Sequence, residues 1–100
     1  NTHMTQVLAQ ENTDIDPDST VTTIESAYKK FLTDETTYTV AVYTVNEEAL
    51  SGYDKDLETI RGMSKSKAKA VAEDGVMKKV GTATIVLNTK TDEVLSFSMK

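Results

Sequence analysis

The stretch VMKKVGTATIVLNTKTDEVLSFSM, residues 76–99, decides the fold class of this chain. Apolar and β-branched residues dominate 76–87, and polar residues suited to a turn fill 88–92. The returning segment, 93–99, alternates apolar residues with serines: Leu95, Ser96, Phe97, Ser98 and Met99. Successive strand residues point to opposite faces, so this pattern predicts a β-hairpin whose last strand is buried on one side. Gly81 is expected to mark a bulge or a close backbone approach.

Two elements are predicted upstream of this hairpin. Residues 37–45 are rich in threonine, tyrosine and valine, which predicts a strand. Apolar residues fall on both of its faces, so we expect both faces to be covered. A helix is predicted over residues 21–32, because apolar residues recur there at helical spacing. These residues are Val21, Ile24, Ala27, Tyr28, Phe31 and Leu32, and we expect them, with the remaining aromatic residues, to lie in the core.

Two further helices are predicted between the strands. Asn46 is a good N-cap for a helix that begins at Glu47 and ends before Gly62. Its buried stripe would consist of Leu50, Tyr53, Leu57 and Ile60. Ser64 can cap a shorter helix over residues 65–73, with Ala68, Val71 and Ala72 inward. Gly75 suits the left-handed position that ends such a helix.

The element order α-β-α-α-β-β predicts a small single α+β domain, residues 20–100. We expect a three-stranded sheet in the order 1-3-2, a split β-α-β arrangement, with the helices packed on it. Residues 1–19 are polar and acidic, with too few apolar groups to offset the entropy of ordering, so a disordered leader is expected. A His-Met pair at residues 3–4 is typical of a cloning remnant, and residues 1–3 are set aside on that ground.

The composition excludes several classes of chemistry. The chain has 100 residues, no cysteine and one histidine, His3, so it lacks the parts of a cysteine nucleophile, a Ser-His pair or a typical zinc site. Its four glycines form no phosphate loop. We therefore predict no catalytic residues and a protein that is not an enzyme. No apolar run is long enough to cross a bilayer, so no membrane partner is expected. The localisation stays open, with a reducing, cytoplasmic compartment favoured by the lack of cysteine.

The residues from Asp14 to Glu25 resemble the calcium loop of the EF-hand family. Acids fall at alternate positions, a carbonyl follows two residues later and a glutamate closes the loop. The resemblance implies a calcium ion held by Asp14, Asp16, Asp18, Thr20 and Glu25. Ser19 replaces the glycine of the family's sharp turn, and Pro17 stiffens the loop. The alternative interpretation is an acidic leader that runs into a capped helix, in which case no cofactor is bound.

Residues 57–71 resemble a helix-hairpin-helix element, whose family binds nucleic-acid backbone without reading sequence. Gly62-Met63-Ser64 stands at the hairpin and Ala68 at the packed alanine of the second helix. The resemblance implies backbone binding by Arg61, Gly62, Ser64, Lys65, Lys67 and Lys69. Free amides at the start of the second helix would meet a phosphate, and the basic side chains would add charge. Ser64 replaces the family's second glycine, and a capped helix with a solvated lysine face is the alternative.

The charge distribution bears on the choice of partner. The net charge is −5, with −7 on residues 1–50 and +2 on residues 51–100. An acidic chain does not attract nucleic acid by its overall field, although a local basic patch can still bind. The leading hypothesis is a non-enzymatic protein-protein interaction domain, regulatory or part of an assembly, that binds another protein or itself through an exposed sheet edge. Nucleic-acid backbone binding through residues 57–71 is the alternative, and an acidic decoy that occupies the basic groove of a nucleic-acid enzyme is a third hypothesis.

Overall fold

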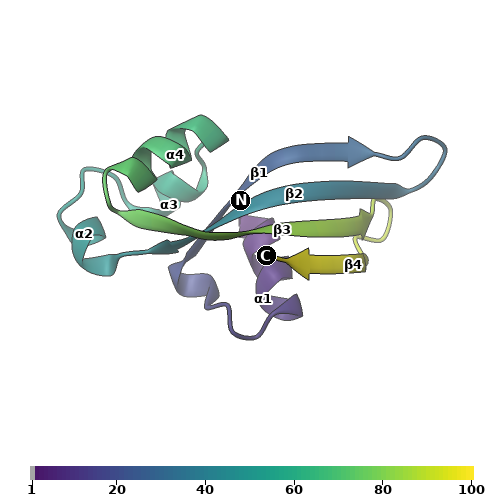
Figure 1. Cartoon of the computed structure of the whole chain (residues 1–100), viewed down its shortest axis with the longest axis horizontal. Coiled ribbons are helices and arrows are strands. Elements are labelled where there is room, and N and C mark those ends of the chain that lie inside the picture. Colours follow the sequence, from purple (N-terminus) through teal and green to yellow (C-terminus); the bar gives the residue numbers. More distant parts are fainter. Residues whose placement is uncertain (1) are drawn as a thin grey trace.

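Four antiparallel strands form one sheet along the length of the molecule (Figure 1). The structure is a computed structural model that describes residues 2–100, so Asn1 of the predicted cloning remnant lies outside the described residues. The strands are β1 (Thr20–Lys29), β2 (Glu35–Val45), β3 (Met77–Asn88) and β4 (Val94–Met99), in the order β1-β2-β3-β4. The small α+β domain is confirmed. The predicted three-stranded sheet in the order 1-3-2 is wrong, because each strand pairs with the next one along the chain.

The strand β1 replaces the helix predicted over residues 21–32. Its first half is an unbroken run of five β-branched residues, Thr20, Val21, Thr22, Thr23 and Ile24. Such residues lose side-chain freedom in a helix and pack well on a pleated sheet. They pair with β2 from Thr20 opposite Thr44 onward. The helical spacing of the apolar residues was therefore coincidental, and strand propensity with pairing partners outweighed it.

The helical elements flank the sheet. They are α1 (Thr2–Glu11), the short 3-10 helix η1 (Pro17–Ser19), α2 (Glu47–Ser51), α3 (Leu57–Arg61) and α4 (Lys65–Glu73). The boundaries predicted for α4 are confirmed, as is the N-cap of α2, where the Asn46 side chain accepts a hydrogen bond from the Ala49 amide at 3.3 Å. The single helix predicted to run from Glu47 toward Gly62 is wrong. It is divided by a turn, after which the Asp56 side chain caps α3 by accepting from the Thr59 amide at 2.8 Å.

The segment predicted to be a disordered leader is part of the core. Met4, Val7 and Leu8 of α1 are buried against one face of the sheet, where they meet Val40, Val42, Ala83, Ile85 and Leu87. Inside this layer the hydroxyls of Thr5 and Thr22 form a hydrogen bond of 2.9 Å. The expectation of disorder is wrong because one short apolar stripe suffices once a sheet face is present to receive it.

The opposite face of the sheet is covered only at one end. There α3 and α4 bury Ile60, Ala68 and Val71 against Val21, Ala41, Tyr43, Val76 and Met77. Figure 1 shows these helices grouped at one end of the sheet, while the hairpin ends of the strands extend beyond them. The cross-strand row Ser26, Thr39, Thr84 and Ser98 crosses the uncovered part of this face. The prediction that strand 37–45 is covered on both faces holds for only part of its length.

The C-terminal hairpin is present as predicted, but Leu95 does not share the buried face of Phe97 and Met99, because it lies at a register shift and is 45% exposed. The turn at 88–92 is organised by Asn88, whose side chain accepts from the amides of Lys90 and Thr91 at 2.9 and 3.0 Å. The β2–β3 register shifts next to Gly81, and a Cβ atom there would overlap the Lys100 carbonyl oxygen. Gly81 therefore serves both predicted purposes, a bulge and a close backbone approach. Gly75 has a φ of 83°, as expected for the residue that follows α4.

Candidate interaction surfaces

The outer edge of β4 is a free sheet edge without charge. Val94–Met99 contains no charged residue, and it is flanked by Glu93 and Lys100. In the described part of the chain β4 pairs only with β3, and α1 lies next to its C-terminal end, where the Asn12 side chain approaches the Met99 sulfur at 3.9 Å (Figure 1). Its sole irregularity is a register shift at Leu95, near its start. Natural proteins commonly protect edge strands with charges, proline or bulges, so this edge is suited to pairing with another chain.

The direction of the free backbone groups on β4 follows from its last hydrogen bonds. Lys100 donates to the Thr82 carbonyl at 3.0 Å, and the Thr82 amide donates to the Lys100 carbonyl at 3.2 Å. Antiparallel partners alternate between pairs that exchange both bonds and pairs that exchange none. Ser98 and Ser96 therefore bond to β3, whereas Phe97 and Met99 direct their amides and carbonyls away from the sheet. The side chains of Phe97 and Met99 are half-buried against the core that α1 covers.

The other sheet edge, on β1, is protected. Its first half lies under α1, α3 and α4. Its second half has a bulge at Glu25, whose carboxylate forms an ion pair of 3.4 Å with Lys79 of β3. Bulges and charges discourage pairing with a further strand. The two edges of the sheet are therefore chemically different, and only β4 presents an uncharged strand.

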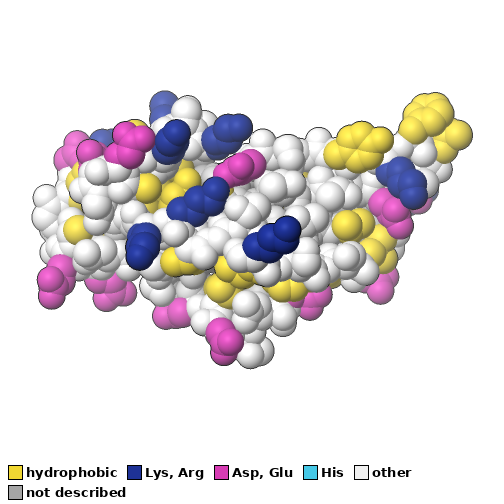
Figure 2. All heavy atoms as spheres, in the orientation of Figure 1, with side chains coloured by type: hydrophobic (Ala, Val, Ile, Leu, Met, Phe, Trp, Pro, Cys, Tyr) yellow, Lys and Arg dark blue, Asp and Glu magenta, His cyan; other side chains and the backbone are white. Residues whose placement is uncertain are grey.

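The tip of the β1–β2 hairpin is an exposed apolar cluster that the sequence did not predict. Tyr28, Phe31 and Leu32 are 67%, 84% and 88% exposed. Figure 2 shows hydrophobic side chains, in yellow, at the end of the molecule where Figure 1 places the β1–β2 hairpin. The prediction that Tyr28 and Phe31 lie in the core is wrong, because the strand extends past the helices that would cover them. Leu32 also has a φ of 62°, a left-handed conformation that is strained for a residue with a side chain.

The six residues predicted to bind nucleic acid lie at the end of α3, in the turn that follows it and on α4. Lys65, Lys67 and Lys69 are exposed. Arg61 instead turns toward the protein and donates to the carbonyls of Pro17 and Thr20 at 2.6 and 3.2 Å. Gly62 has a φ of −86°, and a Cβ atom there would have ordinary contacts, so nothing local requires glycine. Figure 2 shows dark blue side chains gathered around α4.

A hollow at the start of α4 encloses about 440 Å³. It is lined by Thr2, Thr23, Ile24, Arg61, Gly62, Met63, Ser64 and Lys65. Thr23 is only 4% exposed, and its hydroxyl has no hydrogen-bond partner within residues 2–100. Ser64, at the N-cap, makes no side-chain capping bond. Sequence reasoning found Ser64 and Lys65 but missed Thr23, because only the folded chain brings β1 next to this hairpin.

The residues predicted to bind calcium are distributed over different elements. Asp16 caps η1 by accepting from the Asp18 amide at 2.9 Å, and Glu25 lies on β1 in its ion pair with Lys79. The Thr20 carbonyl, which the calcium loop would offer to the ion, accepts from Arg61. Across residues 2–100 no three acidic or histidine side chains converge as a metal site would require. Asp14 is therefore not part of such a group.

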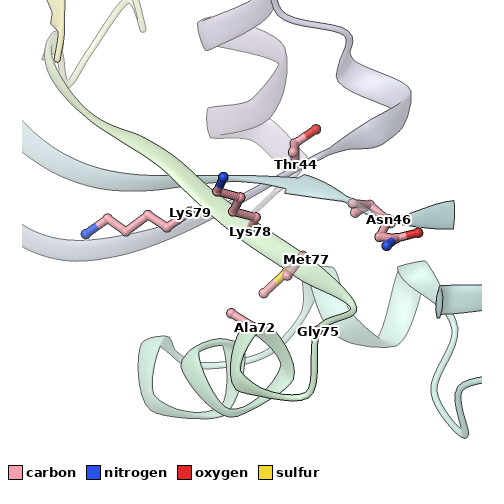
Figure 3. A pocket seen from close by; sticks show the side chains of 8 residues that line it. Thr44, Asn46, Ala72, Gly75, Met77, Lys78 and Lys79 are labelled. Atoms are coloured by element: carbon pink, nitrogen blue, oxygen red, sulfur yellow. The ribbon is translucent and has the colours of Figure 1, made fainter.

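A second hollow lies between the end of β2, the start of β3 and the end of α4 (Figure 3). It encloses about 590 Å³ and is lined by Thr44, Val45, Asn46, Ala72, Gly75, Met77, Lys78 and Lys79. In Figure 3 the Lys79 side chain extends away from the other labelled residues. The lining therefore offers the Lys78 amine and neutral side chains, and none of its residues is acidic.

Among the helices of residues 2–100, none is long and apolar enough to span a membrane.

Comparisons with known proteins add no relatives to this picture. No family model matches the chain, and neither a curated protein nor a solved structure matches it.

Proposed function

We propose that this chain is a non-enzymatic interaction domain that associates with a second copy of itself through the outer edge of β4. The observation that carries the proposal is the pair of unprotected backbone positions at Phe97 and Met99, on a strand without charged residues. An edge of this kind is a template for another strand, and backbone hydrogen bonds supply the affinity. The protected β1 edge explains why association would use one side of the sheet only.

A two-fold axis at Ser98 gives the simplest pairing of two antiparallel β4 strands. Phe97 of one copy then lies opposite Met99 of the other, and each such pair exchanges two backbone hydrogen bonds. Their half-buried side chains would meet across the junction, next to the core layer under α1. The result is one continuous sheet made from both copies. Such a contact is isologous, so it closes at a dimer and leaves no further β4 edge exposed.

A pair of serine-to-lysine variants tests this proposal. Ser26 and Ser98 are exposed and lie at opposite ends of one cross-strand row, on the β1 edge and the β4 edge. Ser98→Lys would oppose two lysines across the two-fold axis, which disfavours pairing. Ser26→Lys adds the same charge to the same sheet face but to the protected edge. Both substitutions leave the core intact.

Sedimentation velocity over a concentration series measures the outcome. We expect the parent chain and Ser26→Lys to shift from monomer to dimer as concentration rises, and Ser98→Lys to stay monomeric. A parent chain that remains monomeric throughout the series would refute self-association. Equal dimerisation of the two variants would instead show that copies associate through a surface other than β4.

A further inference from the structure

The tip of the β1–β2 hairpin is an ordered turn that exposes apolar side chains. The Lys30 amide donates to the Glu35 carbonyl at 3.1 Å, which closes the hairpin. The Asp34 carbonyl accepts from the amide and the hydroxyl of Thr89, at 2.6 and 3.0 Å, so the neighbouring β3–β4 turn supports the tip. An apolar cluster that is already ordered loses little conformational entropy on binding. These contacts therefore suit the tip to act as a rigid anchor for another molecule.

The conformation of Leu32 also indicates a functional role for the tip. Leu32 has a φ of 62° and is 88% exposed, so its side chain carries a steric cost without packing inside the chain. Strained backbone of this kind concentrates at functional sites. Figure 1 shows the hairpin extending beyond α3 and α4, which leaves Tyr28, Phe31 and Leu32 open to a second molecule. Exposed apolar patches of this kind are typical of interaction sites.

The charges beside the apolar cluster are divided between the two arms of the hairpin. The arm that leaves β1 carries Lys29 and Lys30, and the arm that enters β2 carries Asp34 and Glu35. Lys90 of the neighbouring turn lies 3.7 Å from the Asp34 carboxylate. Within residues 2–100, Lys29, Lys30 and Glu35 have no ion-pair partner closer than 4 Å. A two-fold axis perpendicular to the hairpin places the basic arm of one copy opposite the acidic arm of another, so the tip is complementary in charge to itself.

We propose that two copies of this chain associate through their β1–β2 tips about such an axis, so that their apolar clusters pack together and Lys30 of each copy faces Glu35 of the other. Three largely exposed side chains from each copy would bury roughly 1,000 Å² in total, the lower end of the range for specific interfaces. The contact is therefore weak and requires a higher protein concentration than pairing of β4. It uses no β4 residue, so it does not depend on the proposed function. A chain that makes both contacts assembles beyond a dimer.

The test is an amide-resolved NMR dilution series at high concentration, carried out on the Ser98→Lys chain to prevent β4 pairing. The amide signals of Phe31, Leu32 and Thr33 should shift with protein concentration. Adding Phe31→Ser should weaken association at least about a hundredfold, because the symmetry removes two buried rings at once. Adding Lys67→Glu reverses a charge on α4, away from the tip, and should change association less than about twofold.

Charge reversal tests the two-fold arrangement in the same Ser98→Lys background. Lys30→Glu and Glu35→Lys should each weaken self-association about tenfold, because the symmetry replaces both ion pairs by like charges. Mixing the two variants should restore association, since each copy then presents the charge that the other lacks. Isotope labelling of only one variant makes its tip amides report on the mixed pair alone.

Three results would overturn the proposal. They are tip amides that do not shift with concentration, a Phe31→Ser chain that associates as strongly as its background, and a mixture of the charge-reversed variants that binds no better than each variant alone. Tip signals that move on addition of phosphatidylcholine vesicles, and not with protein concentration, would likewise overturn it and assign the tip to a lipid surface. Failure of the parent chain to pair through β4 leaves each of these outcomes unchanged, so the two proposals fail separately.

Discussion

The phenol of Tyr53 donates a hydrogen bond of 2.7 Å to Oδ2 of Asp74, which joins the turn before α3 to the residue that ends α4. This bond is the main reason that the pKa of Tyr53 rises from 10.0 to about 12, with smaller contributions from desolvation and from the charges of Asp74 and Asp54. Ionisation of the phenol would remove the donated proton and bring two negative charges together. The bond therefore favours the neutral phenol.

Replacing Asp74 by alanine should return the pKa of Tyr53 from about 12 toward its ordinary value of 10.0. The ring-carbon NMR shifts of the tyrosines measure this directly as a function of pH. The folded-state pKa is the higher one, so the contribution of the bond to stability is complete below pH 10 and is lost between pH 10 and about 12. The Asp74→Ala chain should lack this component of alkaline destabilisation. A Tyr53 titration unchanged by the substitution would show that the bond is not the cause.

Gly81→Ala should destabilise the fold, because the new Cβ atom would overlap the Lys100 carbonyl oxygen and crowd the Met99 side chain. A loss of about 1–3 kcal/mol in the free energy of unfolding is expected, as for other overpacked sites. Gly52→Ala is the matched control, since nothing lies within 4 Å of the Cβ position there. Urea denaturation of the two variants measures the difference. Equal stability of both variants would mean that Lys100 does not approach β3 as described.

Replacing the strained turn residue Leu32 by glycine should stabilise the β1–β2 hairpin. Leu32 is 88% exposed, so little packing is lost, and glycine adopts a φ of 62° without the steric cost that leucine has there. Leu32→Gly should be about 1 kcal/mol more stable than Leu32→Ala, which removes the side chain but keeps the strain. Thermal unfolding of both variants provides the comparison. An alanine variant as stable as the glycine variant would contradict the left-handed conformation.

The helix α1 should contribute strongly to stability although its sequence suggested a disordered leader. Leu8 is fully buried between α1 and the sheet, so Leu8→Ala is expected to cost about 2–5 kcal/mol. The neighbouring Gln6 is exposed, and Gln6→Ala should have little effect. Chemical denaturation of both variants tests the claim. An unchanged free energy of unfolding in Leu8→Ala would instead support the prediction that residues 1–19 are a disordered leader.

The elements that were predicted correctly are those with agreement between local signals. In α4 the cap at Ser64, the inward alanine and valine residues and Gly75 all indicate one helix. In the C-terminal hairpin, alternation and turn residues agree in the same way. Both patterns are complete within a few residues of sequence, so no distant partner was needed to interpret them.

The elements that were missed depend on distant partners. The apolar residues of β1 fit a helical stripe on paper, but β2 offers a full set of backbone partners and the β-branched residues prefer that arrangement. The apolar stripe of α1 is too short to indicate a helix without the sheet face that receives it. The turn between α2 and α3 also escaped prediction, because the cap at Asp56 interrupts a regular apolar spacing.

The candidate sites divide in the same way. The α3–α4 segment could be inferred from sequence, because it is continuous along the chain. The position of β4 at a sheet edge could not, because the predicted order 1-3-2 placed residues 93–99 between the other two strands, whereas β3 pairs with β2 on its other side. Thr23 could not be joined to Ser64, since 40 residues separate them and only the packing of α4 beside β1 brings them together. The exposed tip at Phe31 was missed because the local sequence does not show whether an apolar residue is covered by a helix or extends past it into solvent.

Pairing of two β4 strands can be tested by disulfide formation, because the parent chain has no cysteine. With a two-fold axis at Ser98, the two Ser98 Cα atoms lie about 4.5 Å apart, within the range of a disulfide. The two Ser96 Cα atoms would then be separated by roughly 14 Å. We expect Ser98→Cys to form a covalent dimer rapidly under mild oxidation and Ser96→Cys to remain uncoupled. Equal coupling of the two variants, or none by either, would contradict pairing of β4 about Ser98.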